Sequence, residues 1–147
     1  MIMDQVSVFV ENKPGALADI AARLAEAGVD LKALTIADTA DFGVMRFLSD
    51  SPKKALALLK LNGWVASLTP VVAACVDDRP GALAQILMMF SDEEITVEYM
   101  YAFVAQEEGH AYVVFRVQDA ERAERLLEAA GFQSSAPFAK ERENKQL

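Results

Sequence analysis

Hydrophobic and polar positions alternate with two periods along the chain, one typical of strands and one typical of helices. An apolar run at 6–10 is followed by apolar residues at helical spacing, namely Leu17, Ile20 and Leu24. Two β-rich runs at 29–36 and 42–48 come next, separated by a turn-forming break. A second helical segment carries Ala55, Leu58 and Leu59 before Gly63-Trp64, and a last apolar run covers 64–69. The first half is therefore predicted to be β-α-β-β-α-β.

The second half repeats this pattern. Pro14-Gly-Ala-Leu-Ala18 recurs as Pro80-Gly-Ala-Leu-Ala84, a shift of 66 residues. The following helical segment carries Leu83, Ile86 and Phe90, and β-rich runs occupy 95–104 and 111–117. A final helical segment then carries Ala123, Leu126 and Leu127 before Gly131-Phe132. The chain is therefore predicted to contain two copies of one unit.

The fold class that this order predicts is α+β. Each βαββαβ unit is most simply a ferredoxin-like sandwich, an antiparallel sheet with its helices on one face. We expect the first domain at 1–70 and the second at 71–139, with the strand at 64–69 running through Pro70 into the next strand. The polar segment 140–147 lacks periodicity, so we expect a disordered tail.

Composition excludes several functional classes. The chain has 147 residues, 53% of them hydrophobic, and a formal net charge of -8, which disfavours binding to nucleic acid. No apolar stretch is long enough to span a membrane, and the start lacks the pattern of a signal peptide, so we expect a cytoplasmic protein. The single cysteine, Cys75, lies in an apolar run and is interpreted as a packing residue.

Three segments carry a resemblance to a known family, the ACT domains. They are the residues after the first strand, those entering the second strand, and those ending the second helix: Asn12-Lys13-Pro14-Gly15-Ala16-Leu17, Ala27-Gly28-Val29-Asp30-Leu31, and Leu58-Leu59 with Gly63-Trp64. The resemblance covers residues 4–138. It implies two regulatory modules that respond to a free amino acid and lack a catalytic domain.

The loop before the first helix is the predicted ligand site. Proline favours the first helical position, so the N–H groups of Gly15, Ala16 and Leu17 should be free to bind a carboxylate beside the positive end of the helix dipole. The family resemblance adds Asn12, with its neighbours Lys13 and Pro14, as ligand contacts. It also places Asp30 and Leu31 at the site, where the Asp30 carboxylate would favour an ammonium group.

Each of these residues also has a purely structural interpretation. Asn12 would then cap the helix, Pro14-Gly15 would mark a strand-to-helix junction, and Asp30 would be a solvated acid at a strand edge. The sequence leaves these alternatives open.

The second repeat offers a matching but chemically different site. Its residues are Asp78, Arg79, Pro80, Gly81, Ala82, Leu83 and Thr96. Asp78 replaces Asn12, and a carboxylate there competes for the helix dipole that a ligand carboxylate would use. We therefore expect this loop to bind carboxylates less well, unless Arg79 offsets the repulsion.

The remaining residues do not form an active site. His110, the only histidine, falls in a predicted hairpin turn and is expected to be exposed, and the methionines, including Met88, Met89 and Met100, have core-like spacing. Neither a metal site nor a cofactor motif nor a nucleophile with its base is found. We therefore expect a non-catalytic amino-acid sensor, at least a homodimer, with its ligand between ACT modules. The alternatives are a ligand-free assembly module and a regulatory subunit that partners an enzyme of amino-acid biosynthesis.

Overall fold

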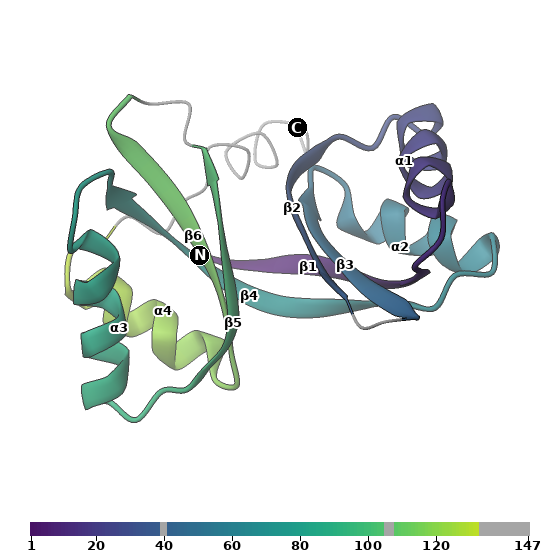
Figure 1. Ribbon diagram of the computed structural model, residues 1–147. Helices are drawn as coiled ribbons and strands as arrows, with labels where there is room; N and C mark the ends of the chain where they lie inside the picture. The colour runs from purple at the N-terminus through teal and green to yellow at the C-terminus, as the bar shows by residue number, and fades with distance from the viewer. Residues whose placement is uncertain (39–40, 105–107, 133–147) are drawn as a thin grey trace, which may run out of the picture. The chain divides into compact units, whose positions relative to one another are not determined.

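The computed structural model describes residues 1–38, 41–104 and 108–132. The expected tail at 140–147 and the region expected to hold the last strand of the second repeat lie outside the described residues. The elements are β1 (Ile2–Glu11), α1 (Ala16–Glu26), β2 (Leu31–Asp38), β3 (Phe42–Ser49), α2 (Pro52–Leu61), β4 (Ala66–Asp77), α3 (Ala82–Asp92), β5 (Val97–Val104), β6 (His110–Val117) and α4 (Ala120–Ala129) (Figure 1). The α+β class and the order of elements are as the sequence predicts.

The chain divides into two compact units. Asp4–Thr69 forms the N-terminal unit, and Met1–Met3 join the residues from Pro70 onward in the C-terminal unit. β4 belongs to both, because one unbroken strand passes through Pro70, as the apolar pattern on both sides predicts. The hydrogen-bonded strand order is β2-β3-β1-β4-β6-β5, and each unit is described separately below.

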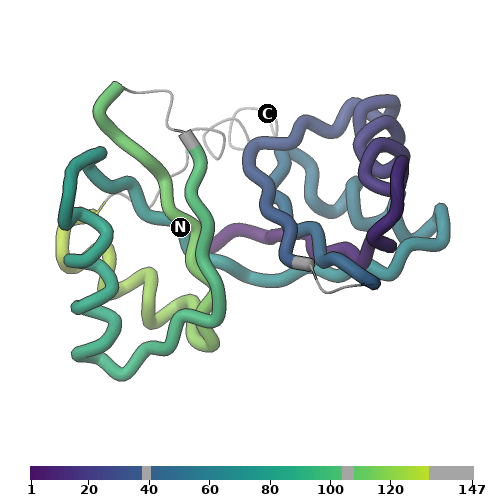
Figure 2. The backbone as a smooth tube through the Cα atoms, viewed as in Figure 1, coloured from purple at the N-terminus to yellow at the C-terminus, as the bar shows by residue number. Residues whose placement is uncertain are grey.

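In the N-terminal unit the strands lie in the order β2-β3-β1-β4. β3 is antiparallel to both neighbours, with Glu11 of β1 opposite Phe42 and Leu31 of β2 opposite Ser49. α1 and α2 cover one face of this sheet (Figures 1 and 2). Alternate strand residues point to that face and form the core with the buried helix residues, including Val8, Phe47, Ile20, Leu24 and Leu59.

The C-terminal unit repeats this layout with β5, β6 and β4, and α3 and α4 cover one face (Figure 1). Met1–Met3 lie on the other side of β4, where Ala73 N–H donates to the Met1 carbonyl oxygen at 3.4 Å. The Met1 ammonium group also pairs with Glu124 of α4 at 3.1 Å. The start of β1, which the sequence assigns to the first repeat, thus packs with the second.

Three residues that the periodicity placed in the core are exposed instead. Leu17 is 42% exposed, Met88 59% and Met100 42%. Met88 lies on the side of α3 opposite the buried Ile86 and Phe90, because two residues along a helix turn the side chain by about 200°. Met100 lies on the helix-covered face of the sheet with its cross-strand partner Phe115. It is exposed because β5 is the edge strand and has no neighbouring strand on its outer side in the described sheet. The core interpretation of these residues is therefore wrong.

No helix in the described part of the chain is long and apolar enough to cross a lipid bilayer.

Candidate ligand-binding site

The β1–α1 loop is held in place by backbone hydrogen bonds and by one left-handed glycine. Asn12 N–H donates to Asp41 O at 3.0 Å, and Lys13 N–H donates to Glu11 O at 2.9 Å. Gly15 then adopts φ 86°, a conformation that costs other residues steric strain, and α1 begins directly after it. Gly15 is therefore the N-cap of α1, so the interpretation of Asn12 as the helix cap is wrong.

The start of α1 differs from the sequence-based expectation in two respects. Pro14 lies in the turn before the helix, not at its first position, because Gly15 takes the left-handed conformation between them. Ala16 N–H donates to Lys13 O at 3.3 Å, so it is not free for a ligand. Within the described residues, the N–H groups of Gly15 and Leu17 have no acceptor. Two of the three expected donors remain available for an anion.

The side chains of this loop are exposed. Lys13 Nζ lies 2.9 Å from Glu11 Oε2. The hydrogen bond from Lys13 to Glu11, and then their charge attraction, raise the pKa of Lys13, so its ammonium group stays charged near neutral pH. Asn12 and Pro14 are also exposed. The loop thus presents a charged pair and two backbone donors to solvent.

The second repeat forms the same loop from different side chains. Gly81 has φ 91°, Ala82 N–H donates to Arg79 O at 3.3 Å, and Asp78 N–H donates to Gly109 O at 2.8 Å. Arg79 Nε pairs with Asp77 Oδ2 at 3.3 Å, in the place of the Lys13 and Glu11 pair. Pro80 again precedes the helix and Leu83 is half-buried. The backbone of the predicted site is therefore duplicated.

Asp30 and Leu31 lie at the opposite end of the sheet from the first loop. Glu11, which ends β1, pairs with Phe42 at the start of β3, and Asp38, which ends β2, pairs with the next residue of β3. Leu31, which begins β2, pairs with Ser49 at the other end of β3. The eight residues of β2 span about 25 Å, so Asp30 and Gly15 of one unit cannot contact one small ligand. Asp30 pairs instead with Lys32 Nζ at 2.6 Å. Thr96, just before β5, is separated from the second loop in the same way.

A hollow of about 360 Å³ lies beside the loop in the N-terminal unit. The end of β1, the loop, the first turn of α1, the start of β3 and the residues after α2 line it, including Glu11, Lys13, Ala16, Asp19, Phe42 and Trp64. Arg23 of α1 links three residues of this lining. It pairs with Asp19 at 3.1 Å and donates a hydrogen bond to Asn62 Oδ1 at 2.8 Å. Its guanidinium also lies 5.7 Å from the Trp64 ring centroid. Asn12 is not part of the lining.

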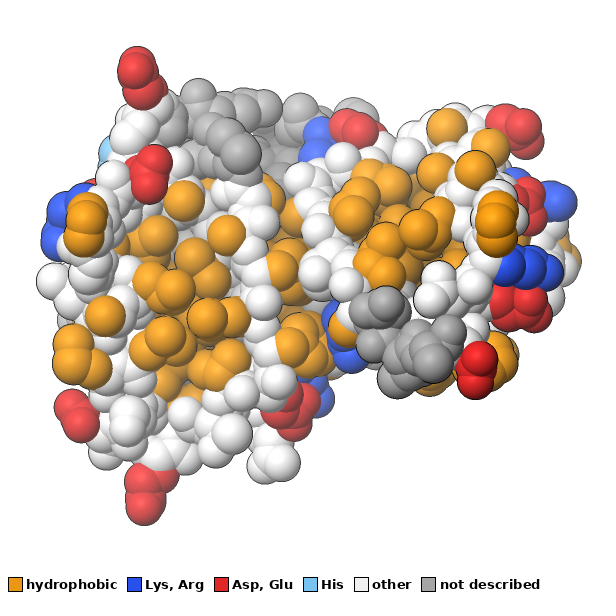
Figure 3. Space-filling view, in the orientation of Figure 1, with side chains coloured by type: hydrophobic (Ala, Val, Ile, Leu, Met, Phe, Trp, Pro, Cys, Tyr) orange, Lys and Arg blue, Asp and Glu red, His pale blue; other side chains and the backbone are white. Residues whose placement is uncertain are grey.

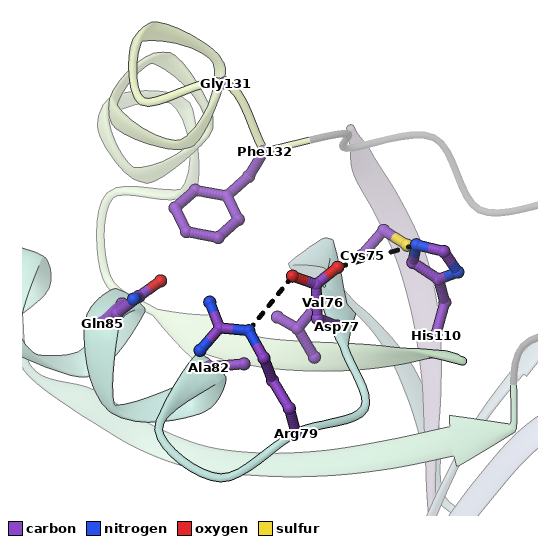
Figure 4. Close-up of a pocket in the computed structure, with 9 residues that line it drawn as sticks. All are labelled: Cys75, Val76, Asp77, Arg79, Ala82, Gln85, His110, Gly131 and Phe132. Atoms are coloured by element: carbon purple, nitrogen blue, oxygen red, sulfur yellow. Dashed lines mark hydrogen bonds and ion pairs between the residues drawn. The ribbon is translucent and has the colours of Figure 1, made fainter.

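The C-terminal unit has a hollow of about 310 Å³ in the corresponding place (Figure 4). Each of its nine lining residues occupies the position of a residue that lines the first hollow: Cys75, Val76, Asp77, Arg79, Ala82, Gln85, His110, Gly131 and Phe132. The hairpin register confirms the alignment, since His110 faces Asp77 as Phe42 faces Glu11. A concave feature at one position in both repeats is a consequence of the fold and not of a single side chain.

The comparison with protein families identifies this architecture. The model of the ACT domain pair matches residues 1–136. The chain belongs to the ACT domain family. No curated protein matches the sequence. Among solved structures, protein BT0572 from Bacteroides thetaiotaomicron is 36% identical, with a TM-score of 0.87 and 94% of each chain covered.

Two regulatory proteins share the fold of this ACT pair at lower identity. The regulatory subunit of aspartate kinase from Thermus thermophilus is 19% identical, with a TM-score of 0.65, and the match covers 89% of this chain and 97% of that one. The regulatory subunit from Thermus flavus is 18% identical, with a TM-score of 0.59, 88% of this chain and 95% of that one covered. At these identities the likeness establishes the fold alone.

The sequence did not point to the aromatic residue of each hollow. Trp64 and Phe132 follow the glycine after the second helix of each ACT domain, and neither aromatic residue was predicted to belong to the site. Asp19 and Gln85 were also missed, although both lie in the first turn of the helix that follows the predicted loop. The available signal was the repeat itself, because Gly63-Trp64 and Gly131-Phe132 recur with the rest of the pattern.

His110 and Cys75 turn out to share the second hollow. His110 is exposed, as expected, but it is the first residue of β6 and its Nε2 lies 3.7 Å from Asp77 Oδ1. Cys75 is half-buried and lines the same hollow, so it is not only a packing residue. No group of three metal-ligating side chains occurs among the residues that the structure describes.

Proposed function

We propose that this ACT pair is a cytoplasmic, non-catalytic regulatory protein that binds a free amino acid at the β1–α1 loop of its N-terminal unit. The ligand carboxylate binds the Gly15 and Leu17 N–H groups at the positive end of α1, with Asn12 beside it. The observation that carries this proposal is the left-handed Gly15, which holds two N–H groups of an exposed loop without an acceptor in the described residues. Family membership supports the regulatory role.

The position of Asp30 supports a site completed by a second module. In its own unit Asp30 lies at the far end of β2, a strand of about 25 Å, from the loop, so an Asp30 that contacts the ligand ammonium comes from another ACT module. Ligand binding then strengthens the association of modules, and association strengthens ligand binding by the same factor. The protein reports the amino acid through its state of assembly.

Exposed apolar side chains support association with a second copy of the chain. β2 is the edge strand of the sheet in the N-terminal unit. Its Leu34 and Ile36 are 51% and 42% exposed, and both lie on the face of the sheet that the helices cover. Figure 3 shows hydrophobic side chains gathered between β2 and α1, and a second group between β5 and α3 of the C-terminal unit. An edge strand beside an apolar surface is a site where chains pair.

Replacing Leu34 and Ile36 together by lysine should convert a dimer to a 16.0 kDa monomer, because the charges cannot be buried in an apolar interface. Light scattering after gel filtration at low micromolar concentration measures the mass. Leu61→Lys is the matched control, since Leu61 is already 86% exposed at the end of α2. A parent protein of 16.0 kDa would contradict the proposed dimer.

Calorimetric titration of the standard amino acids tests the proposed function. We expect at least one to bind, and Asn12→Asp to weaken its binding by about 1–3 kcal/mol by placing a negative charge against the carboxylate. Asp78→Asn is the matched change in the second repeat and should leave binding unchanged or improve it. If no amino acid binds the parent, the proposal is wrong and a ligand-free assembly module is favoured.

A regulatory subunit of an amino-acid biosynthetic enzyme is the second candidate. The regulatory subunits of aspartate kinase, which share the fold, support it. An enzyme that co-purifies with the chain and changes its activity on addition of the bound amino acid would establish this role.

A further inference from the structure

We propose that Cys75 is a modification site, at which His110 activates the thiol for exchange with a small disulfide. The proposal does not depend on amino-acid binding, because it concerns a covalent reaction of the protein's own side chain. Cys75 is the only cysteine of the chain. It is half-buried on β4 and lines the second hollow together with His110. A reagent that enters this hollow therefore reaches the thiol.

Cys75 and His110 are neighbours on one face of the sheet. Cys75 pairs with Tyr112 and Asp77 pairs with His110 across β4 and β6, so His110 takes the diagonal position next to Cys75. These side chains lie on the face that α3 and α4 do not cover, because Val76, between Cys75 and Asp77, belongs to the core. Diagonal neighbours are within reach of an aromatic side chain. Figure 4 shows the Cys75 thiol directed toward the imidazole ring.

The Asp77 carboxylate supports the imidazole as a base. Asp77 Oδ1 lies 3.7 Å from His110 Nε2, and Oδ2 accepts a hydrogen bond from Arg79 Nε at 3.3 Å. When His110 takes a proton, its positive charge is stabilised by this carboxylate. A thiol beside an imidazole, which in turn faces a carboxylate, is an arrangement that activates a nucleophilic cysteine.

The first repeat shows that the fold does not require these two residues. Phe9 and Phe42 stand where the second repeat has Cys75 and His110, and both line the first hollow. They are 56% and 55% exposed, so side chains at these two positions are open to solvent. The second repeat thus replaces two aromatic rings with a nucleophile and a base. The reactivity comes from these side chains and not from the ACT scaffold.

The reaction is a thiol–disulfide exchange. His110 takes the proton of the Cys75 thiol, and the thiolate attacks one sulfur of a small disulfide, R–S–S–R. A bond forms between Cys75 Sγ and that sulfur, and the S–S bond of the reagent breaks. The leaving thiolate takes the proton from the imidazolium and departs as RSH. The cysteine is oxidised and the reagent is reduced, so no further oxidant is needed.

The rate of this exchange on the full chain tests the proposal. Dithiodipyridine is the probe, because it is uncharged and its cleavage releases a pyridinethione whose absorbance is measured. All release comes from one thiol, since the chain has a single cysteine. The folded parent should react about tenfold faster than the chain unfolded in urea, where the thiol has no base beside it. A folded parent that reacts no faster than the unfolded chain would refute the proposal.

His110→Phe, which copies the first repeat, should slow the reaction of the folded chain about tenfold or more, because the base is lost. Gln85→Ala is the matched control. Gln85 lines the same hollow but lies on the side away from the thiol (Figure 4), so its removal should leave the rate unchanged. Equal rates for the parent and His110→Phe would contradict the role of His110.

The pH profile of the rate separates a base from a side chain that only shapes the hollow. The parent's rate should follow an ionisation that His110→Phe lacks. The other titratable or charged groups on this side are Asp77, Tyr112 and Arg79, and the variant retains all three. The same profile in both proteins would show that His110 does not take the proton.

Mass spectrometry identifies the product. Incubation of the parent with glutathione disulfide should give one mixed disulfide, on the peptide that contains Cys75, and a reducing agent should remove it. A parent that reacts with dithiodipyridine but forms no such adduct would contradict exchange with small disulfides of this class. Neither measurement involves an amino acid, so failure of this proposal leaves the proposed function standing.

Discussion

Phe90→Ala should lower the free energy of unfolding of the C-terminal unit by about 3–5 kcal/mol, the usual cost of removing a fully buried phenylalanine ring. Phe90 is 1% exposed and lies between α3 and the sheet. Its ring meets Phe115 edge to face, with centroids 5.3 Å apart and planes at 81°. The substitution therefore removes apolar burial and an aromatic pair together, and leaves a cavity that the surrounding side chains fill only in part.

Hydrogen exchange of the α3 and β6 amides, followed with urea denaturation, measures this loss in the unit that contains Phe90. Met88→Ala is the control on the same helix, because Met88 is 59% exposed and its truncation should change stability by no more than about 0.5 kcal/mol. Equal losses for the two variants would mean that α3 does not pack as described.

Gly15→Val should cost at least about 1–2 kcal/mol of stability and also abolish binding at the first loop. Gly15 has φ 86°, and an L-residue in that region carries a steric penalty of about 1–2 kcal/mol, which is larger for a β-branched side chain. An added Cβ would have no heavy atom within 4 Å, so the cost comes from the backbone and not from a clash. Relief of the strain moves the Gly15 and Leu17 N–H groups out of line, and the valine side chain occupies the approach to them.

Urea denaturation gives the stability of Gly15→Val, and titration of the folded variant gives its affinity. Gly43→Ala is the matched control, because an added Cβ there meets Ile36 Cγ2 at an ordinary 3.5 Å. A Gly15→Val variant that is as stable as the parent and binds ligand equally well would refute both the strain and the loop site.

The chemical difference between the two ACT domains is concentrated at a few positions of one surface feature. The backbone of the loop has the same conformation in both domains, with left-handed Gly15 and Gly81. In both, the N–H of the first helical residue donates to the carbonyl oxygen three residues earlier. Side chains differ around it, most clearly where Gln85 replaces Asp19 and His110 replaces Phe42. The two repeats share one scaffold, while the charged side chains that line their hollows differ.

The sequence by itself determined the order of the elements from β1 to α4 and the residues that build each core stripe. Ile20, Leu24, Ile86 and Phe90 are buried where the helical period places them, and the strand periods locate β1 to β6. These features follow from local rules, because side-chain direction repeats with the geometry of each element. The left-handed conformation of Gly15 was not predicted, because Pro14 was expected at the first helical position; glycine permits this conformation, and the turn into α1 uses it.

Tertiary structure alone decided the composition of the site. Trp64 lies far from Lys13 along the chain, yet both line one hollow, whereas Asp30 is nearer in sequence and lies at the far end of the sheet. Likewise, only the strand order shows that Leu34 and Met100 are on the outermost strands and therefore exposed. Which ends of strands meet, and which strand lies at an edge, depends on pairing between distant segments, and no local period of the sequence encodes it.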